Sequence, residues 1–176
     1  GRLQEALDHN AKALAAAHET GNRLLEGNTL CNRGLLLQLL GDAANARHCL
    51  EQALDISRTL GNAYLESNVL CNLGIVCESL NQPDAAQEHY EAAAALARTL
   101  GDRHSEGQFL GYLGLLHARR SHHMQAGDCL DAGQALLESA LDRIGLGVLL
   151  CSRAEAAHLA DEPLAAQTAL DAALAI

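Results

Sequence analysis

The sequence predicts an all-α protein in which antiparallel helix pairs stack into an α-solenoid. The composition is 49% hydrophobic, rich in Ala and Leu, and only 2% aromatic. This favours helices, because Ala and Leu cost least in a helix while strands prefer β-branched and aromatic residues. The same residues also return every 40 positions, since "NTLCNRG" at 28–34 matches "NVLCNLG" at 68–74. Two turn signals in each period then divide every repeat into two helices, as in other repeat architectures.

The predicted helices follow in order along the chain. Residues 2–19 form the second helix, B, of a truncated repeat whose first helix, A, is missing. Helix A is expected at 23–40, 63–80, 103–120 and 143–160, and helix B at 43–59, 83–99, 123–139 and 163–175. Residues 1–176 thus form a single array of one truncated, three full and one nearly full repeat, with limits at 1–20, 21–60, 61–100, 101–140 and 141–176.

Turn residues set these helix limits. After helix A the position of Gly41 is taken in later repeats by Asn81, Ser121 and Asp161, as expected of a left-handed C-terminal cap. Before each helix A stands a residue that can accept an N–H bond from the first helical turn. These N-cap residues are Asn22, Asn62, Asp102 and Asp142.

Small residues recur where the two helices of a pair must approach each other. A larger residue recurs beside them and fills the remaining space. The small residues are Gly34, Gly74, Gly114 and Ala154 in helix A, and Ala46, Ala86, Ala126 and Ala166 in helix B. The larger residues are Leu50, Tyr90, Leu130 and Leu170.

This pattern, with N-[LR]-G in helix A, resembles the tetratricopeptide repeat. The 40-residue spacing is similar to the long-helix variety in Pins/LGN adaptors and in bacterial regulators, and the resemblance covers all 176 residues. It implies a right-handed superhelix in which the A helices line a concave wall. Arg33 and Arg153 depart from the pattern, which has Leu there, and Ala154 replaces Gly. We therefore expect looser packing in the fourth repeat.

One stripe of each A helix is the candidate binding surface, because its residues are three and four positions apart and share a face. The stripe residues are Leu24, Asn28, Cys31, Leu35, Gln38, Tyr64, Asn68, Cys71, Ile75, Glu78, His104, Gln108, Leu115, Cys151 and Glu155. Amides can bond a peptide backbone, small residues leave room for it, and apolar residues offer pockets for anchor side chains. The alternative is that tight curvature packs these columns on one another. Asn32 and Asn72 are expected to be buried and bonded across repeats.

Charge and length argue against two classes of partner. The chain has 12 basic and 22 acidic residues, and no basic cluster is large enough to follow a track of phosphates. Nucleic acid is therefore not an expected partner. No apolar run approaches the roughly 18 residues that span a bilayer, so no membrane partner is expected either.

Catalytic and metal motifs are not expected from this sequence. It contains no phosphate loop, no nucleophile elbow and no isolated carboxylate pair, so we predict neither enzyme activity nor a cofactor. The spacings among His117, His122, His123 and Cys129 match no closed zinc site. The six cysteines lie in helical segments without a CxxC pair, and we expect reduced thiols in a cytoplasmic protein.

The sequence thus predicts an interaction module of a larger cytoplasmic signalling or regulatory protein, which binds a peptide segment or helix of a partner protein. Two alternatives stay open. One is the sensory module of a regulator that binds a small ligand or a signalling peptide. The other is a self-association module, since the incomplete repeats at both ends predict end-to-end association.

Overall fold

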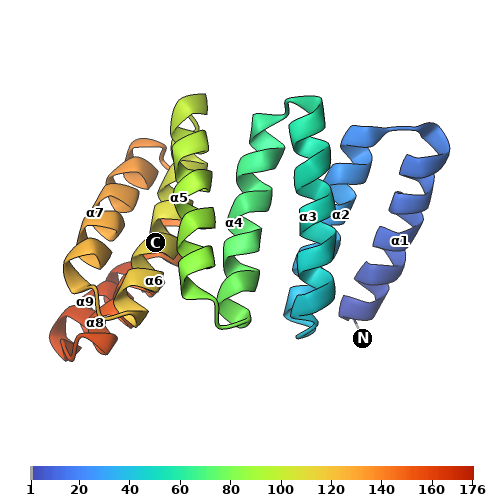
Figure 1. Cartoon of the computed structure of the whole chain (residues 1–176). Coiled ribbons are helices and arrows are strands. Elements are labelled where there is room, and N and C mark those ends of the chain that lie inside the picture. The colour runs from blue at the N-terminus through green and yellow to red at the C-terminus, as the bar shows by residue number, and fades with distance from the viewer. Residues whose placement is uncertain (1) are drawn as a thin grey trace. The chain divides into compact units, whose positions relative to one another are not determined.

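The computed structural model describes residues 2–176, and every regular element in that range is an α-helix (Figure 1). The helices are α1 (Arg2–Thr20), α2 (Arg23–Leu39), α3 (Ala43–Leu60), α4 (Ala63–Ser79), α5 (Pro83–Leu100), α6 (Arg103–Arg119), α7 (His123–Ser139), α8 (Arg143–Leu159) and α9 (Pro163–Leu174). Each predicted limit agrees with the structure to within one residue. The all-α helix-pair fold is confirmed.

The chain forms two compact units, one extending to His89 and the other covering Tyr90–Ile176, with the boundary inside α5. In the first unit α2 packs on α1 and α3, and α4 packs on α3 and α2. In the second unit α6 packs on α7, and α8 packs on α6, α7 and α9. Consecutive helices within each unit run antiparallel (Figure 1). None of the helices in residues 2–176 is both long enough and apolar enough to cross a bilayer.

Left-handed residues end the helices as the turn signals predict. Gly21, Gly41, Gly61 and Gly101 have φ between 62° and 82°. In the other turns the left-handed residues are Asn81, Ser121, Leu141 and Asp161, with φ between 55° and 60°. Leu141 is unusual among them, because a left-handed backbone with a bulky side chain costs about 1–2 kcal/mol.

The predicted N-caps also form. The Asn22 side chain accepts a hydrogen bond from the Leu25 amide at 3.0 Å. The corresponding amides of the other A helices donate in the same way to Asn62, Asp102 and Asp142 at 3.0–3.1 Å.

A polar contact, called here the clamp, spans three of the four turns from helix B to helix A. It joins the last turn of helix B to a glutamate in the first turn of helix A. The clamps are His18–Glu26 at 3.2 Å, Arg58–Glu66 at 2.9 Å and Arg98–Glu106 at 2.7 Å. At the fourth turn Glu138 and Leu146 occupy these two positions, and Leu146 cannot complete a clamp.

The core lies where the predicted small residues meet the large ones. A Cβ added to Gly34 would lie 2.6 Å from Leu50 Cγ, and one added to Gly114 would lie 2.8 Å from Leu130 Cγ. Both leucines are buried. Because a Cβ has no room there, the paired helices approach as closely as the sequence predicts.

Candidate functional site: the A-helix stripe

Most of the predicted stripe of the first unit gathers around one pocket between α2 and α4. The pocket has a volume of about 390 Å³. Six of its lining residues belong to the predicted set: Leu24, Asn28, Cys31, Leu35, Tyr64 and Asn68. Helical spacing explains the grouping, because the three- and four-residue steps along α2 and α4 turn these side chains toward the same side.

The amide groups of the pocket differ in what they already bond. Asn68 Nδ2 donates to the Tyr64 carbonyl of its own helix at 2.8 Å. Asn72 Nδ2 donates to Cys31 Sγ at 3.3 Å and so connects α4 to α2. Asn28 and Asn32 are exposed. The pocket therefore has two exposed amides, Asn28 and Asn32, beside two amides that already donate hydrogen bonds, Asn68 and Asn72.

Asn72 and Asn32 occupy the same repeat position but have different surroundings. Asn72 bonds across repeats and is half-buried, whereas Asn32 is exposed, which corrects its predicted burial. The physical reason is that Asn72 faces the preceding A helix, α2. Within the described residues α2 follows a B helix, α1, so Asn32 has no preceding A helix to bond.

Two thiols of the stripe are buried. Cys31 is 7% exposed and Cys71 only 3% exposed. Burial raises the pKa of both thiols, and the Asn72 hydrogen bond opposes the rise at Cys31. Both are therefore neutral thiols near pH 7. Cys71 is not among the pocket residues and belongs to the core, which corrects the expectation that its side chain lies in an open groove.

The remaining stripe residues of this unit lie outside the pocket. Gln38 Nε2 donates to Ser79 Oγ at 3.2 Å and so joins the C-terminal turns of α2 and α4. Ile75 and Glu78 are half-buried on α4. These three residues extend the A-helix surface beyond the pocket without lining it.

The second unit has a smaller cavity at the equivalent place, between α6 and α8. Its volume is about 80 Å³, and Gln108 is the one member of the predicted set that lines it. Tyr112 also lines this cavity, at the repeat position of Asn32 and Asn72. Its ring stacks on Tyr90 with centroids 5.9 Å apart. The larger side chain explains why less open space remains.

The other predicted residues of the second unit lie outside its cavity, and two of them form ion pairs. His104 Nδ1 lies 2.6 Å from Asp142 Oδ2, and Glu155 pairs with Arg119 at 2.8 Å. Leu115 is half-buried and Cys151 is exposed. None of these four predicted residues lines the cavity between α6 and α8.

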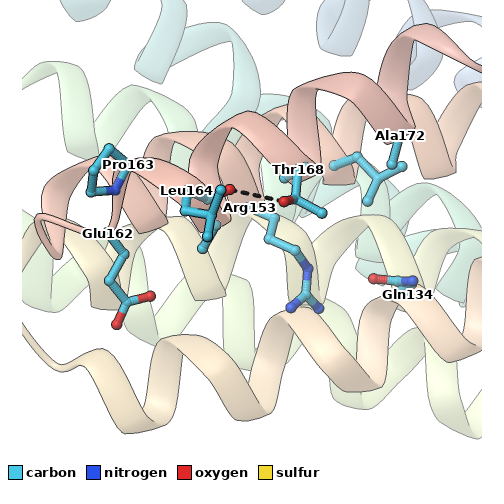
Figure 2. Close-up of a pocket in the computed structure, with 10 residues that line it drawn as sticks. Gln134, Arg153, Glu162, Pro163, Leu164, Thr168 and Ala172 are labelled. Carbon is cyan, nitrogen blue, oxygen red and sulfur yellow. Dashed lines mark hydrogen bonds between the residues drawn. The ribbon is translucent and has the colours of Figure 1, made fainter.

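A larger cavity of the second unit escaped the sequence analysis. It has a volume of about 800 Å³ and lies between α7, α8 and α9 (Figure 2). Arg153 of α8 lines this cavity, and it occupies the repeat position at which Leu73 and Leu113 are buried. That departure from the repeat pattern was the available signal, although it suggested only looser packing.

The histidines and cysteines of the described residues do not gather into a metal site. Within residues 2–176, no three His, Cys, Asp or Glu side chains lie close enough together to hold a metal ion. His117 is buried, and its ring centroid is 5.9 Å from that of the exposed His122.

Comparison with known proteins agrees with this architecture. The family model described as tetratricopeptide repeat matches residues 1–59 and 25–99. BtubC (BKLC) from P. vanneervenii is 18% identical and superposes with a TM-score of 0.80, over 98% of this chain and 72% of that chain. A putative kinesin light chain from P. anserina, with nearly identical TPR-like repeats, is 17% identical, with a TM-score of 0.72 over 99% of this chain and 87% of that one. No curated protein matches the sequence significantly.

Proposed function

Because this chain belongs to the tetratricopeptide repeat family, we propose that it is a protein-interaction module, which holds a peptide segment of a partner against α2 and α4. Tetratricopeptide repeats generally mediate protein–protein interaction. We place the module in a larger signalling or regulatory protein. The six free thiols support a reducing, cytoplasmic location.

The observation that carries this proposal is the pocket between α2 and α4. It joins exposed amides to exposed apolar groups, since Leu24 is 44% exposed and Tyr64 is 55% exposed. A peptide segment offers both backbone N–H and C=O groups and apolar side chains. The pocket can therefore bond the backbone through Asn28 and Asn68 while Leu24, Leu35 and Tyr64 receive an anchor side chain.

The two amides have different roles in this arrangement. The Nδ2 of Asn68 is already bonded within α4, so its Oδ1 is oriented to accept a peptide N–H. The Asn28 amide is exposed and can both donate and accept. An extended peptide alternates N–H donors and C=O acceptors along its edge. This pair of amides can therefore bond a short stretch of peptide backbone whatever its side chains are.

Photocrosslinking tests where the partner sits. A benzoylphenylalanine at position 64 replaces an exposed aromatic ring with a reactive one of similar shape. The matched control carries the same group at His48, which is exposed on α3. The proposal expects cross-links to a defined peptide segment from position 64 and few from position 48. Equal cross-linking from the two positions would show that α2 and α4 do not form the site.

Amide substitution then measures the contribution of each bond. Asn28→Ala and Asn68→Ala should each cost on the order of 1–2 kcal/mol of binding free energy. This corresponds to a roughly 5- to 30-fold weaker affinity for the peptide segment that cross-linking identifies. Because both side chains are exposed, the melting temperature should hardly change. Unchanged affinity in both variants would contradict the amide contacts.

Two further roles have specific support. The pocket volume of about 390 Å³ is within the usual range of small-molecule sites, which favours a sensory role as the second candidate. End-to-end self-association is supported by Ile144 and Leu174, which are 82% and 86% exposed. Sedimentation velocity at increasing protein concentration separates self-association from the other two roles.

A further inference from the structure

A trough runs along the second unit between α7 and α9, with α8 as its floor. The cavity of about 800 Å³ is continued by a second one of about 200 Å³ toward the N-terminal ends of α7 and α9. The two cavities share Arg153, Glu162 and Ala165, so they form one continuous depression. The trough is separate from the pocket between α2 and α4, and no role has been assigned to it above.

Both walls of the trough include small residues. On α9 they include Ala165, Thr168 and Ala172. On α7 the wall includes Gly127, where an added Cβ would meet nothing within 4 Å. Small residues on both sides let another backbone approach closely, as in helix–helix contacts. Along α9 the lining extends from Pro163 to Ala172, or about 15 Å at the helical rise. That length accommodates roughly three turns of a docked helix.

Apolar surface remains open at this place. Leu164, which lines the trough, is 81% exposed (Figure 2). Together with Pro163 and Leu150 it gives the trough an apolar lining. An apolar groove about three helical turns long is a form in which amphipathic helices bind.

The rim of the trough is acidic. Neither α7 nor α9 contains a Lys or Arg. The exposed Asp and Glu residues here have different places. Glu162, just before α9, lines the trough, and Asp131 pairs with Arg153 of the lining. Asp128, Glu138 and Asp171 lie elsewhere on the exposed surfaces of α7 and α9. Such a rim favours a cationic partner and disfavours an anionic one.

The single cation of the lining, Arg153, does not reverse this balance. Its guanidinium lies in the floor and pairs with Asp131 at 2.6 Å. Its buried Nε has no hydrogen-bond partner within residues 2–176. The pair neutralises one charge and holds Asp131 beside the trough. Arg153 shares both cavities with Glu162 but pairs with Asp131 instead.

We propose that this trough docks a basic amphipathic helix of a partner protein. The apolar face of that helix fills the trough against α9, and its Lys or Arg side chains reach the acidic rim. A second copy of this chain fits poorly, because each copy has a net charge of −10 and the long-range repulsion opposes association.

Synthetic peptides test the proposal directly. The probe is a helix-forming peptide of Leu, Ala and Lys with Leu on one face, about 15 residues long, so that as a helix of about 22 Å it covers the whole trough and extends beyond its ends. The charge control replaces every Lys with Glu, and a second control has the same composition scrambled so that no apolar face forms. Fluorescence anisotropy should show that the Lys peptide binds, that added salt weakens it, and that neither control binds comparably. Comparable binding by the Glu peptide or the scrambled peptide overturns the proposal.

A matched pair of substitutions locates the binding. Thr168→Arg fills the trough with a long cationic side chain, whereas His48→Arg places the same side chain at the equivalent exposed position of α3. Thr168→Arg should weaken the Lys peptide at least about tenfold, and His48→Arg should change it little. Equal effects of the two substitutions would place the peptide elsewhere and overturn the proposal.

Two further measurements keep the test decisive. If Thr168→Arg lowers the melting temperature, Glu162→Lys replaces it, because this exposed rim residue can change its charge without filling the trough. Glu162→Lys should weaken the Lys peptide most at low salt. Sedimentation of the unmodified protein and of both variants then tests whether a second copy of this chain occupies the trough. A dimer of the unmodified protein that either substitution abolishes would show that the trough binds a second copy, which overturns the proposal.

Discussion

Substituting Gly34 by Ala tests the close approach of α2 and α3. The added Cβ would lie 2.6 Å from Leu50 Cγ, 2.8 Å from Leu50 Cδ2 and 3.2 Å from the Ala46 carbonyl oxygen. Leu50 is fully buried and Cγ is its branch point, so the side chain cannot move aside without disturbing its neighbours. The backbone of α3 on the other side cannot yield either. The methyl group must therefore separate the two helices.

Gly127→Ala is the matched control, because Gly127 also lies inside a helix but a Cβ there would meet nothing within 4 Å. Replacing a mid-helix Gly by Ala gains about 0.5–1 kcal/mol from backbone entropy. Gly127→Ala should therefore raise the free energy of unfolding by that amount. Gly34→Ala has the same gain but also an overpacking cost of about 1–3 kcal/mol, and the net result should be destabilisation of up to about 2 kcal/mol.

Urea unfolding followed by circular dichroism measures both variants against the unmodified protein. The expected outcome is a pair of opposite shifts, with a lower midpoint for Gly34→Ala and a higher one for Gly127→Ala. If Gly34→Ala stabilises the protein as much as Gly127→Ala does, then α2 and α3 are farther apart than the structure places them. The small-residue explanation of the repeat would then fail as well.

Three further predictions concern single residues. Leu141→Gly should raise the free energy of unfolding by about 1 kcal/mol, because glycine adopts the left-handed backbone without the steric cost that leucine has there. Gly61→Ala should lower the free energy of unfolding by a similar amount for the same reason. Thermal melts that rank the two variants otherwise would contradict this. Burial lowers the pKa of His117 in the folded protein. At pH values around and below the ordinary histidine pKa of about 6.5, the unfolded state therefore binds more protons than the folded state. Stability should consequently fall as the pH drops from about 7 to 5, and His117→Leu should reduce that slope in urea titrations at several pH values. In the native protein a thiol reagent should label the exposed Cys151 first and the buried Cys71 only on unfolding, as mass spectrometry of the labelled peptides can follow.

The helices and their limits were predictable because local chemistry decides them. Asn22 and Asn62 cap their helices as the sequence predicts, and a left-handed residue follows each of the helices α1 to α8. Gly34 identified one of the close helix contacts, because a glycine that returns at one helical position indicates a place with no room for a side chain. These features depend on residues within one repeat and its own partner helix.

The candidate site was less predictable because it depends on neighbours from other repeats. The stripe pattern grouped Asn28 with Asn68, yet the same pattern placed Cys71 on the surface, where the structure buries it. Helical spacing fixes the direction of a side chain, but how much the adjacent helix covers it depends on that helix's position. Arg153 illustrates the same limit, because its departure from Leu was visible while the trough around it depends on how α7 and α9 flank α8.

The clamp has a mechanical consequence at the one turn that lacks it. Where a clamp is present, opening the angle between helix B and the following helix A breaks a polar contact. Between α7 and α8 no clamp resists this opening, and the turn is formed by the strained Leu141. Amide hydrogen exchange in this turn should consequently be faster than at Gly61 or Gly101. Because α7 and α8 border the trough, we expect this turn to open more readily than the clamped turns, with the Arg153–Asp131 pair as a polar contact that still joins the two helices.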